Sequence, residues 1–318
     1  MSVSVLVPAY NCASTLRATL DSVITQTRPA DEVLVMDDGS TDSTRAIAES
    51  YGHKVEVFWQ PNNGPAVARN ALIARAKGDL ITFLDSDDIM HPKYLETQCR
   101  LFEKYPHAVA FFTGHVNFSK GDTYKWQNDP IALSHTTELI PPVEFFRRYN
   151  IATGPFICLF SVPMEALKKL GSEPFKEQGA EDSYCCSMLS LLGSVVYCTA
   201  PLAAIRIRTD SLSANHLWTF GVWVHTFEVL QKQFKEVACP SLLKAFRSAF
   251  AAKRRSYAKL LMGAGRFKDA RIQLRLSLRN SFVPASQGKS LAMLLLTYLP
   301  RQFQPTWPSG FRASVPDE

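Results

Sequence analysis

The sequence lacks an apolar run long enough to cross a membrane. The longest one near the C-terminus, Leu291 to Leu299, is about half of the roughly 20 residues that a membrane-spanning helix needs. At the N-terminus, Pro8 and Asn11 interrupt a very short apolar run, which is unlike a signal peptide. We therefore expect a cytoplasmic protein that does not span a membrane.

The chain also lacks the cysteine spacing of a metal or disulfide framework and the glycine loops that bind phosphate. Its seven cysteines are odd in number and include no Cys-x-x-Cys pair, so we expect free, buried thiols. Neither Gly-x-x-x-x-Gly-Lys nor Gly-x-Gly-x-x-Gly occurs. A Walker-type ATPase and an ordinary NAD enzyme are therefore disfavoured.

The bulk composition is that of a globular protein. Of 318 residues, 46% are hydrophobic and 20% are charged, which allows one large core or two smaller ones. The net charge of +6 suggests an acidic partner. The positive charge gathers in the last third, where Asp269 is the lone acid among the cations from Lys244 to Arg279. Anionic lipid headgroups or plain solvation of a helical face both explain this pattern.

Short apolar runs alternate with amphipathic segments over residues 1–116. We expect three helix starts from residues that favour this position: Ser14 for the first helix, Ser40 and Thr41 for the second, and Pro92 for the fourth. This alternation predicts an α/β fold with a Rossmann-like, mainly parallel sheet covered by helices. The expected strands are Val3–Val7, Glu32–Asp37, Val55–Trp59, Leu80–Asp85 and Ala108–Val116, and the expected helices between them are Ser14–Thr27, Thr41–Ser50, Pro65–Lys77 and Pro92–Tyr105.

The rest of the chain divides by pattern. Residues 117–180 are broken by prolines and give no detailed prediction, whereas Glu181–Leu192 reads as a helix and Val195–Tyr197 as a strand. After about Asn215 the pattern is helical, including one tetratricopeptide-like hairpin near Tyr257–Arg271. We predict a domain over 1–214, in halves 1–116 and 117–214, and a basic helical region over 215–318.

Two predicted strands end in acidic turns, Asp37–Asp42 and Asp85–Asp88. Carboxyl ends of parallel strands form the ligand crevice of such sheets, and carboxylates suit Mg²⁺ or Mn²⁺. An EF-hand calcium loop starting at Asp85 is excluded, because Ile89 stands at a ligand position and Met90 at the glycine position. The Asp-x-Asp-x-Thr or Val motif of aspartyl phosphatases is excluded as well, because Ile89 takes its last place. A plain acidic turn and a divalent-metal site remain as alternatives, and Asp37–Ser40 alone could be a helix cap.

Five segments together resemble the family 2 glycosyltransferases, inverting enzymes of the GT-A fold that use nucleotide sugars. The resemblance is close over about residues 1–115 and weaker beyond. The segments are Val3–Asn11, Asp37–Asp42, Gly64–Asn70, Phe83–Asp88 with its Asp-x-Asp motif, and Gly179–Asp182 with its Glu-Asp motif.

The resemblance implies a role for each matching residue. Asp87 would be the principal ligand of Mn²⁺ or Mg²⁺ with Asp85 in support, and Asp182 would be the general base. Asp38 would read the base with Asp37 beside it, and Arg69 would approach the nucleotide. The remaining residues expected at the nucleotide are Pro8, Ala9, Tyr10, Asp85 and Ser86. Ile205 and Arg208 stand where the family often has tyrosine and histidine.

The expected function is transfer of a sugar by a metal-dependent, inverting, hexosyltransferase-type enzyme. The donor would be a UDP-sugar, bound by the half over 1–116, and the acceptor a saccharide or a lipid-linked molecule, bound by the half over 117–214. The pathway would be cell-surface polysaccharide or glycolipid synthesis. The protein would lie at the inner face of the membrane through its basic helices and would bind no nucleic acid. A nucleotide-sugar-binding module without turnover, which recruits a partner or membrane, is the alternative, and a nucleotidyltransferase is disfavoured because no glycine-rich, arginine-bearing loop follows Val7.

Overall fold

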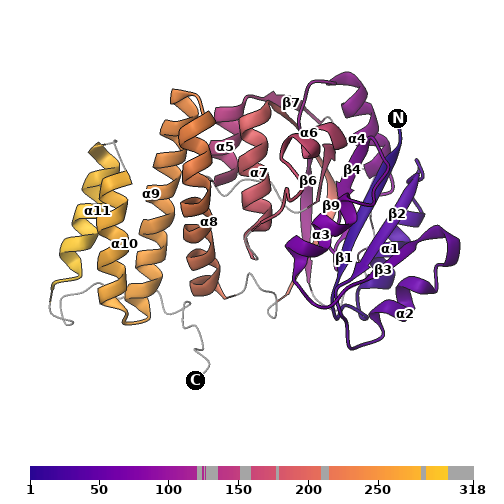
Figure 1. Cartoon of the computed structure of the whole chain (residues 1–318), viewed down its shortest axis with the longest axis horizontal. Helices are drawn as coiled ribbons and strands as arrows, with labels where there is room; N and C mark the ends of the chain where they lie inside the picture. Colours follow the sequence, from indigo (N-terminus) through magenta and orange to yellow (C-terminus); the bar gives the residue numbers. More distant parts are fainter. Residues whose placement is uncertain are drawn as a thin grey trace. The chain divides into compact units, whose positions relative to one another are not determined.

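A computed structural model of the chain divides into two compact units (Figure 1). One unit comprises Met1–Phe145 and Gly154–Arg208, and the other Phe146–Thr153 and Thr209–Glu318. The structure describes residues 1–119, 124, 126, 135–150, 159–176, 179–208, 215–280 and 284–299. The domain boundary predicted after residue 214 lies outside these residues, as does Cys158.

The first half of the α/β unit is the predicted parallel arrangement. Its strands are hydrogen-bonded in the order β3-β2-β1-β4, all parallel. They are β1 (Val3–Ala9), β2 (Glu32–Asp37), β3 (Glu56–Trp59) and β4 (Leu80–Phe83), and the elements between and after them are α1 (Leu16–Ile24), α2 (Thr44–Glu49), η1 (Gly52–Lys54), α3 (Pro65–Ile73) and α4 (Tyr94–Lys104).

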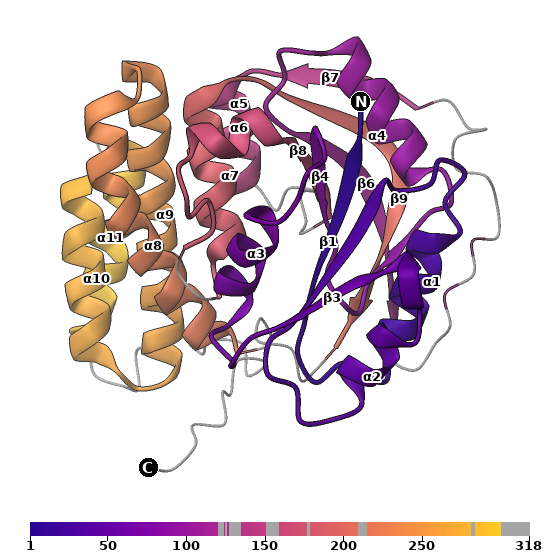
Figure 2. The same ribbon diagram turned by 45° about the vertical axis from the view of Figure 1, so that its right-hand side comes forward.

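Helices cover both faces of this half-sheet, as Figure 2 shows with α1 and α2 on one side and α3 on the other. Alternate residues of β1 supply the two faces. Val3, Val5 and Val7 pack in one hydrophobic core with residues of α1 and α4. Leu6 points to the other face of the sheet, where it is equally buried but is not part of that core. Because the strands are buried on both faces, they read as continuous apolar runs.

The second half makes the sheet mixed. The strand β8 (Phe160–Pro163) runs antiparallel to both β4 and β6 (Phe111–Ser119), and β6 is parallel to the long β9 (Val195–Ile207). The predicted α/β class is thus confirmed with a difference, since the parallel pattern belongs mainly to the first half. The remaining elements are β5 (Ile89–Met90) and β7 (Thr137–Ile140), both antiparallel to β9, and α5 (Pro142–Asn150), α6 (Met164–Lys169) and α7 (Glu181–Leu192).

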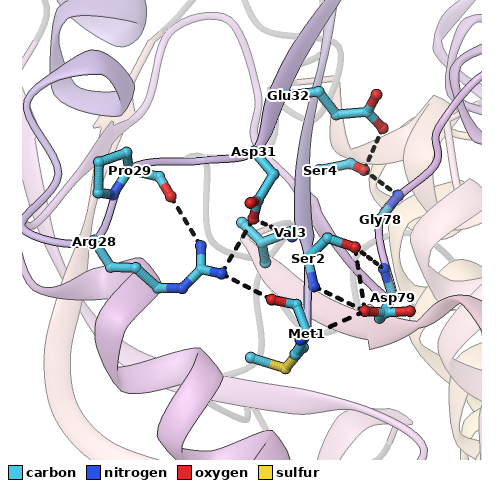
Figure 3. A network of polar contacts seen from close by, with 10 residues as sticks. All are labelled: Met1, Ser2, Val3, Ser4, Arg28, Pro29, Asp31, Glu32, Gly78 and Asp79. Carbon is cyan, nitrogen blue, oxygen red and sulfur yellow. Dashed lines mark hydrogen bonds and ion pairs between the residues drawn. The ribbon is translucent and has the colours of Figure 1, made fainter.

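A network of polar contacts joins the amino end of β1 to neighbouring segments, at the edge of the sheet opposite the acidic turns (Figure 3). Asp79 Oδ2 accepts a hydrogen bond from the Ser2 backbone N–H at 2.8 Å, and Ser4 Oγ accepts one from the Gly78 N–H at 2.9 Å. Asp31 accepts from the Val3 N–H at 2.7 Å. These bonds link β1 to the segments that lead into β2 and β4.

The second unit is built from α8 (His216–Val237), α9 (Pro240–Gly263), α10 (Phe267–Asn280) and α11 (Pro284–Leu296). Each packs on the next, and the α9–α10 hairpin turns at Gly265, whose φ is +76°. The buried Arg254 joins three of them by donating to Glu228 at 2.7 Å and to Gln273 at 2.6 Å. No helix in the described part of the chain is long and apolar enough to span a bilayer.

The described cysteines are all free. Five of them are buried, as expected, and Cys239 is exposed.

Candidate active site

The two acidic turns lie at one edge of the sheet. The register places Ala9 beside Asp37, and Asp37 beside Trp59, at the carboxyl ends of β1, β2 and β3. Next to β1 on its other side, Leu84 donates its N–H to the Leu6 carbonyl at 3.1 Å, immediately before Asp85. This is the edge at which parallel α/β sheets bind ligands.

The turns after β1 and β2 hold each other. Asn11, at φ +45°, donates its N–H to Ser40 Oγ at 3.0 Å and accepts from the Thr41 N–H at 2.9 Å. The buried Asp37 accepts from the Ser40 N–H at 3.0 Å. Tyr10 is 48% exposed beside this pair of turns, so its ring is open to a ligand, whereas Ala9 is buried and Pro8 half-buried.

Asp38 organises the loop that leads into α3. Its Oδ1 accepts from Gln60 Nε2 at 2.7 Å and from the Asn63 N–H at 3.0 Å, and its Oδ2 accepts from the Gly64 N–H at 2.8 Å. Gly64, at φ +86°, is the residue before α3 and adopts a backbone conformation that favours glycine. Asp38 therefore has a loop-fixing role that the sequence did not predict, and its contact with the base remains a prediction.

Arg69 connects the Asp85–Asp88 turn to the start of α7. Its side chain is 4% exposed, and Nη2 donates to Asp85 Oδ1 at 2.6 Å while Nη1 donates to Glu181 Oε1 at 2.8 Å. Nη1 also lies 3.9 Å from Asp182 Oδ1. One buried guanidinium thus donates to two carboxylates and lies within ion-pair distance of a third, and it compensates the charge of the buried Glu181.

The neighbouring Asn70 fixes the segment that precedes α7. Its side-chain amide donates to the Phe175 carbonyl at 2.7 Å and accepts from the Phe175 N–H at 3.0 Å. The Phe175 ring packs on Phe83 with centroids 4.8 Å apart. Asp182, in the first turn of α7 and 20% exposed, is therefore carried by a segment that is bound to both α3 and β4.

Asp87 and Asp88, in the same turn, contact the end of β9 and the residue after it. Asp87 Oδ2 lies 3.3 Å from Arg208 Nη1, and the buried Asp88 accepts from the Arg206 N–H at 3.0 Å. The Ser86 carbonyl accepts from Thr15 Oγ1 at 3.0 Å. Burial and the Asp85 charge raise the pKa of Asp87, although Arg208 opposes this, and burial raises the pKa of Asp88 well above its usual range.

The donor set fits a hard divalent cation. Arg69 takes Oδ1 of Asp85 and Arg208 takes Oδ2 of Asp87, so the second oxygen of each carboxylate remains for a metal. No cluster of three or more histidine, cysteine or acidic side chains placed to hold a metal occurs among the described residues. Two carboxylates completed by phosphate oxygens are what Mg²⁺ sites in nucleotide enzymes use.

Three residues of this arrangement escaped the sequence interpretation. Glu181 was named only as part of the Glu-Asp motif, Asp88 had no assigned role, and Arg208 was noted only as a departure from the family pattern. The Glu-Asp pair was a usable signal for Glu181. Nothing local could reveal Asp88, because its partner Arg206 is 118 residues away.

Comparison with known proteins identifies the family of the chain. Residues 4–171 match the model of "Glycosyl transferase family 2", and the chain belongs to that family. The chain is also similar in structure to solved glycosyltransferases with which it shares less than 25% sequence identity. This similarity confirms the expected GT-A fold.

Two curated relatives illustrate the similarity. The glycosyltransferase GlyA of Streptococcus pneumoniae is 31% identical over 70% of this chain and 32% of its own length. The putative teichuronic acid biosynthesis glycosyltransferase TuaG of Bacillus subtilis is 39% identical over 38% of this chain and 49% of its own length. The chain therefore spans about a third to a half of these relatives.

Solved structures extend the comparison across the chain. S. aureus TarS 1–349 aligns with a TM-score of 0.65 and 17% identity over 94% of this chain and 89% of the TarS chain. TarS has also been solved with UDP and with UDP-GlcNAc. A Pyrobaculum calidifontis mannosyltransferase, solved with GDP-Man and Mn²⁺, aligns with a TM-score of 0.58 and 20% identity over 94% of this chain and 81% of its own.

Proposed function

We propose that this protein is an inverting glycosyltransferase of the hexosyltransferase type, with a nucleotide-sugar donor and a saccharide or lipid-linked acceptor. The observation that carries the proposal is the Arg69 cluster, in which one buried guanidinium contacts Asp85 at 2.6 Å and lies 3.9 Å from Asp182. The candidate metal ligand and the candidate base thus share one fixed partner. Family membership supplies the reaction class.

In the proposed mechanism, Asp182 accepts the proton of an acceptor hydroxyl as that oxygen attacks the anomeric carbon. The bond from the anomeric carbon to the phosphate oxygen breaks, and the nucleoside diphosphate leaves from the opposite face, which inverts the configuration. Asp87, supported by Asp85, would hold Mn²⁺ or Mg²⁺, which neutralises charge on the departing diphosphate when bound. No covalent intermediate with the protein is needed.

The nucleotide contacts are part of the same proposal. The exposed Tyr10, with Pro8 and Ala9 beside it, would line the base pocket. Asp38 would accept from the base through the one remaining lone pair of Oδ2, with Asp37 holding the turn. The UDP and UDP-GlcNAc complexes of TarS favour UDP as the nucleotide. Because the mannosyltransferase was solved with GDP-Man, GDP-sugars should be tested as donors too.

The place of action belongs to the proposal as well. We propose that the protein acts at the cytoplasmic face of a membrane, in cell-surface polysaccharide or glycolipid synthesis. The relative TuaG is named for teichuronic acid biosynthesis, and the helical unit carries a large excess of cations.

The experiment measures nucleoside diphosphate release and product anomers with UDP-, GDP- and dTDP-sugars in Mn²⁺ and in Mg²⁺. We expect Asp182→Asn to lower turnover by about a hundredfold or more while UDP affinity stays within about threefold. Asp87→Asn should instead weaken UDP binding chiefly when metal is present. The matched control is Glu165→Gln, which changes an 80% exposed carboxylate and should leave turnover unchanged.

Each result bears on a separate part of the proposal. Full turnover in Asp182→Asn would remove the assignment of the base, and unchanged metal dependence in Asp87→Asn would remove the metal ligand. Donor binding by the wild-type protein with no turnover for any donor would establish the binding-module alternative.

A further inference from the structure

The end of the helical unit exposes a stripe of large apolar side chains. Leu291 is 49% exposed, Leu295 61%, Tyr298 55% and Leu299 41%. Spacings of four, seven and eight residues put these side chains on one face of α11 and of the turn after it. Ser290 and Met293, on the other face, are buried. Single exposed leucines are ordinary, whereas a contiguous stripe marks a contact surface.

Cations border this stripe. At its C-terminal end, the Arg271 guanidinium lies 4.1 Å from the centroid of the Tyr298 ring, and Arg275 Nη2 donates to the Tyr298 hydroxyl at 3.0 Å. Arg275 is exposed on α10, so its charge is open to a partner beside the stripe. The apolar stripe and the cations therefore belong to one surface.

The wider region has almost no negative charge to balance these cations. From Pro240 to Leu299 the sequence holds 12 lysines and arginines and one acid, Asp269. Arg266 already pairs with Asp269 at 2.8 Å. An anionic partner therefore suits this surface.

We propose that the α11 stripe inserts into the headgroup region of an anionic lipid membrane, with Arg271 and Arg275 meeting the lipid phosphates. This inference deepens the proposed function by naming the partner of the helical unit and its contact residues. An apolar face with flanking cations and an interfacial tyrosine is what a helix lying in the membrane interface presents.

Two other occupants fit the stripe less well. A second copy of the chain would bring the same cations together around a dry contact, where like charges repel strongly. A soluble polyanion would neutralise the cations but would leave Leu291 and Leu295 in water. A lipid surface satisfies both parts of the patch.

The test is co-sedimentation of the full chain with vesicles of three parts phosphatidylcholine to one part phosphatidylglycerol, compared with phosphatidylcholine alone. We expect binding to the mixed vesicles that weakens at high salt. Leu291→Ser with Leu295→Ser should weaken that binding at least about tenfold, because both side chains would be withdrawn from the lipid. Val237→Ser is the matched control, since Val237 is 68% exposed at the end of α8 and should leave binding unchanged.

Three outcomes would overturn the proposal. The first is equal vesicle binding by the wild-type protein and the double serine variant. The second is no binding to either vesicle, and the third is a dimer without lipid that the double variant abolishes. Donor hydrolysis measured without vesicles on the same variants keeps this result separate from the proposed chemistry, because the stripe lies outside the residues assigned to sugar transfer.

Discussion

Replacing Arg69 with methionine should destabilise the α/β unit strongly. Methionine keeps most of the side-chain length but removes the charge that pairs with Glu181 at 2.8 Å and with Asp85 at 2.6 Å. Glu181 is 9% exposed as a side chain and would remain in the interior without its cation. Removing one partner of a buried ion pair typically costs about 3–5 kcal/mol.

The contributions of the two carboxylates should differ. Asp85 is 28% exposed, so water can replace much of the lost contact, and most of the cost should come from Glu181. Adding Glu181→Gln to Arg69→Met should therefore recover about 2 kcal/mol, because the unpaired buried charge is gone. Asp85→Asn added to Arg69→Met should recover less.

Urea unfolding of the four proteins in the Arg69–Glu181 cycle measures these differences. Because the chain has two units that can unfold separately, hydrogen exchange in α3, β4 and α7 should localise the effect. The control is Lys77→Met, which changes an exposed cation shortly after α3 and should alter stability by less than about 0.5 kcal/mol. A loss below about 1 kcal/mol for Arg69→Met, or strict additivity in the cycle, would refute the account of Arg69 as a charge hub.

Two further predictions concern stability away from the site. Burial lowers the pKa of Lys253 from 10.5 to about 8, which corresponds to about 3 kcal/mol. Because the unfolded chain binds the extra proton between these values, wild-type stability should rise over that pH range relative to Lys253→Met. Urea unfolding at several pH values checks this, and a pH-independent difference between the two proteins would show that the Trp223 ring, 3.5 Å from Lys253 Nζ, holds the charged form instead. At Gly78, alanine would place its Cβ 2.7 Å from the Ser4 backbone nitrogen, so Gly78→Ala should cost about 1–3 kcal/mol; a melting temperature equal to wild type would contradict the tight packing of β1 against that turn.

Local sequence patterns were sufficient to predict the strands and helices in the first half of the α/β unit, but not those in the second half. Strands and helices up to residue 116 repeat at short spacing, and most of their predicted positions agree with the structure within a few residues. In contrast, β8 is paired on both sides with strands distant in sequence, and β9 extends to Ile207 where only Val195–Tyr197 was predicted. Such pairings depend on long-range contacts that no local pattern encodes.

The residues at which the first two helices begin were also not predicted correctly from local sequence. Ser40 was expected before the second helix, but its hydroxyl accepts from Asn11 and the residue before α2 is Ser43. Ser14 was expected before the first helix, which instead follows Thr15. Polar residues that usually cap helices are here used to join two turns at the candidate site.

The acidic residues of the candidate site could be found from sequence, whereas their mutual contacts could not. Asp85, Asp87 and Asp182 stand out by position in recognisable motifs. That Arg69 contacts Glu181 across 112 residues, and that Arg208 contacts Asp87 across 121, follows only from the folded chain. The roles of these side chains in sugar transfer remain predictions.

The contacts of Arg69 and Asn70 also limit how this protein can be recombined with its relatives. Asp85 belongs to the first predicted half, and Phe175 and Glu181 belong to the second, yet all three are held by two adjacent residues of α3. A chimera that takes residues 117–214 from another protein must bring a carboxylate at position 181 and a matching backbone at position 175. Residues 117–214 can therefore be exchanged for those of a relative only if both of these contacts are kept.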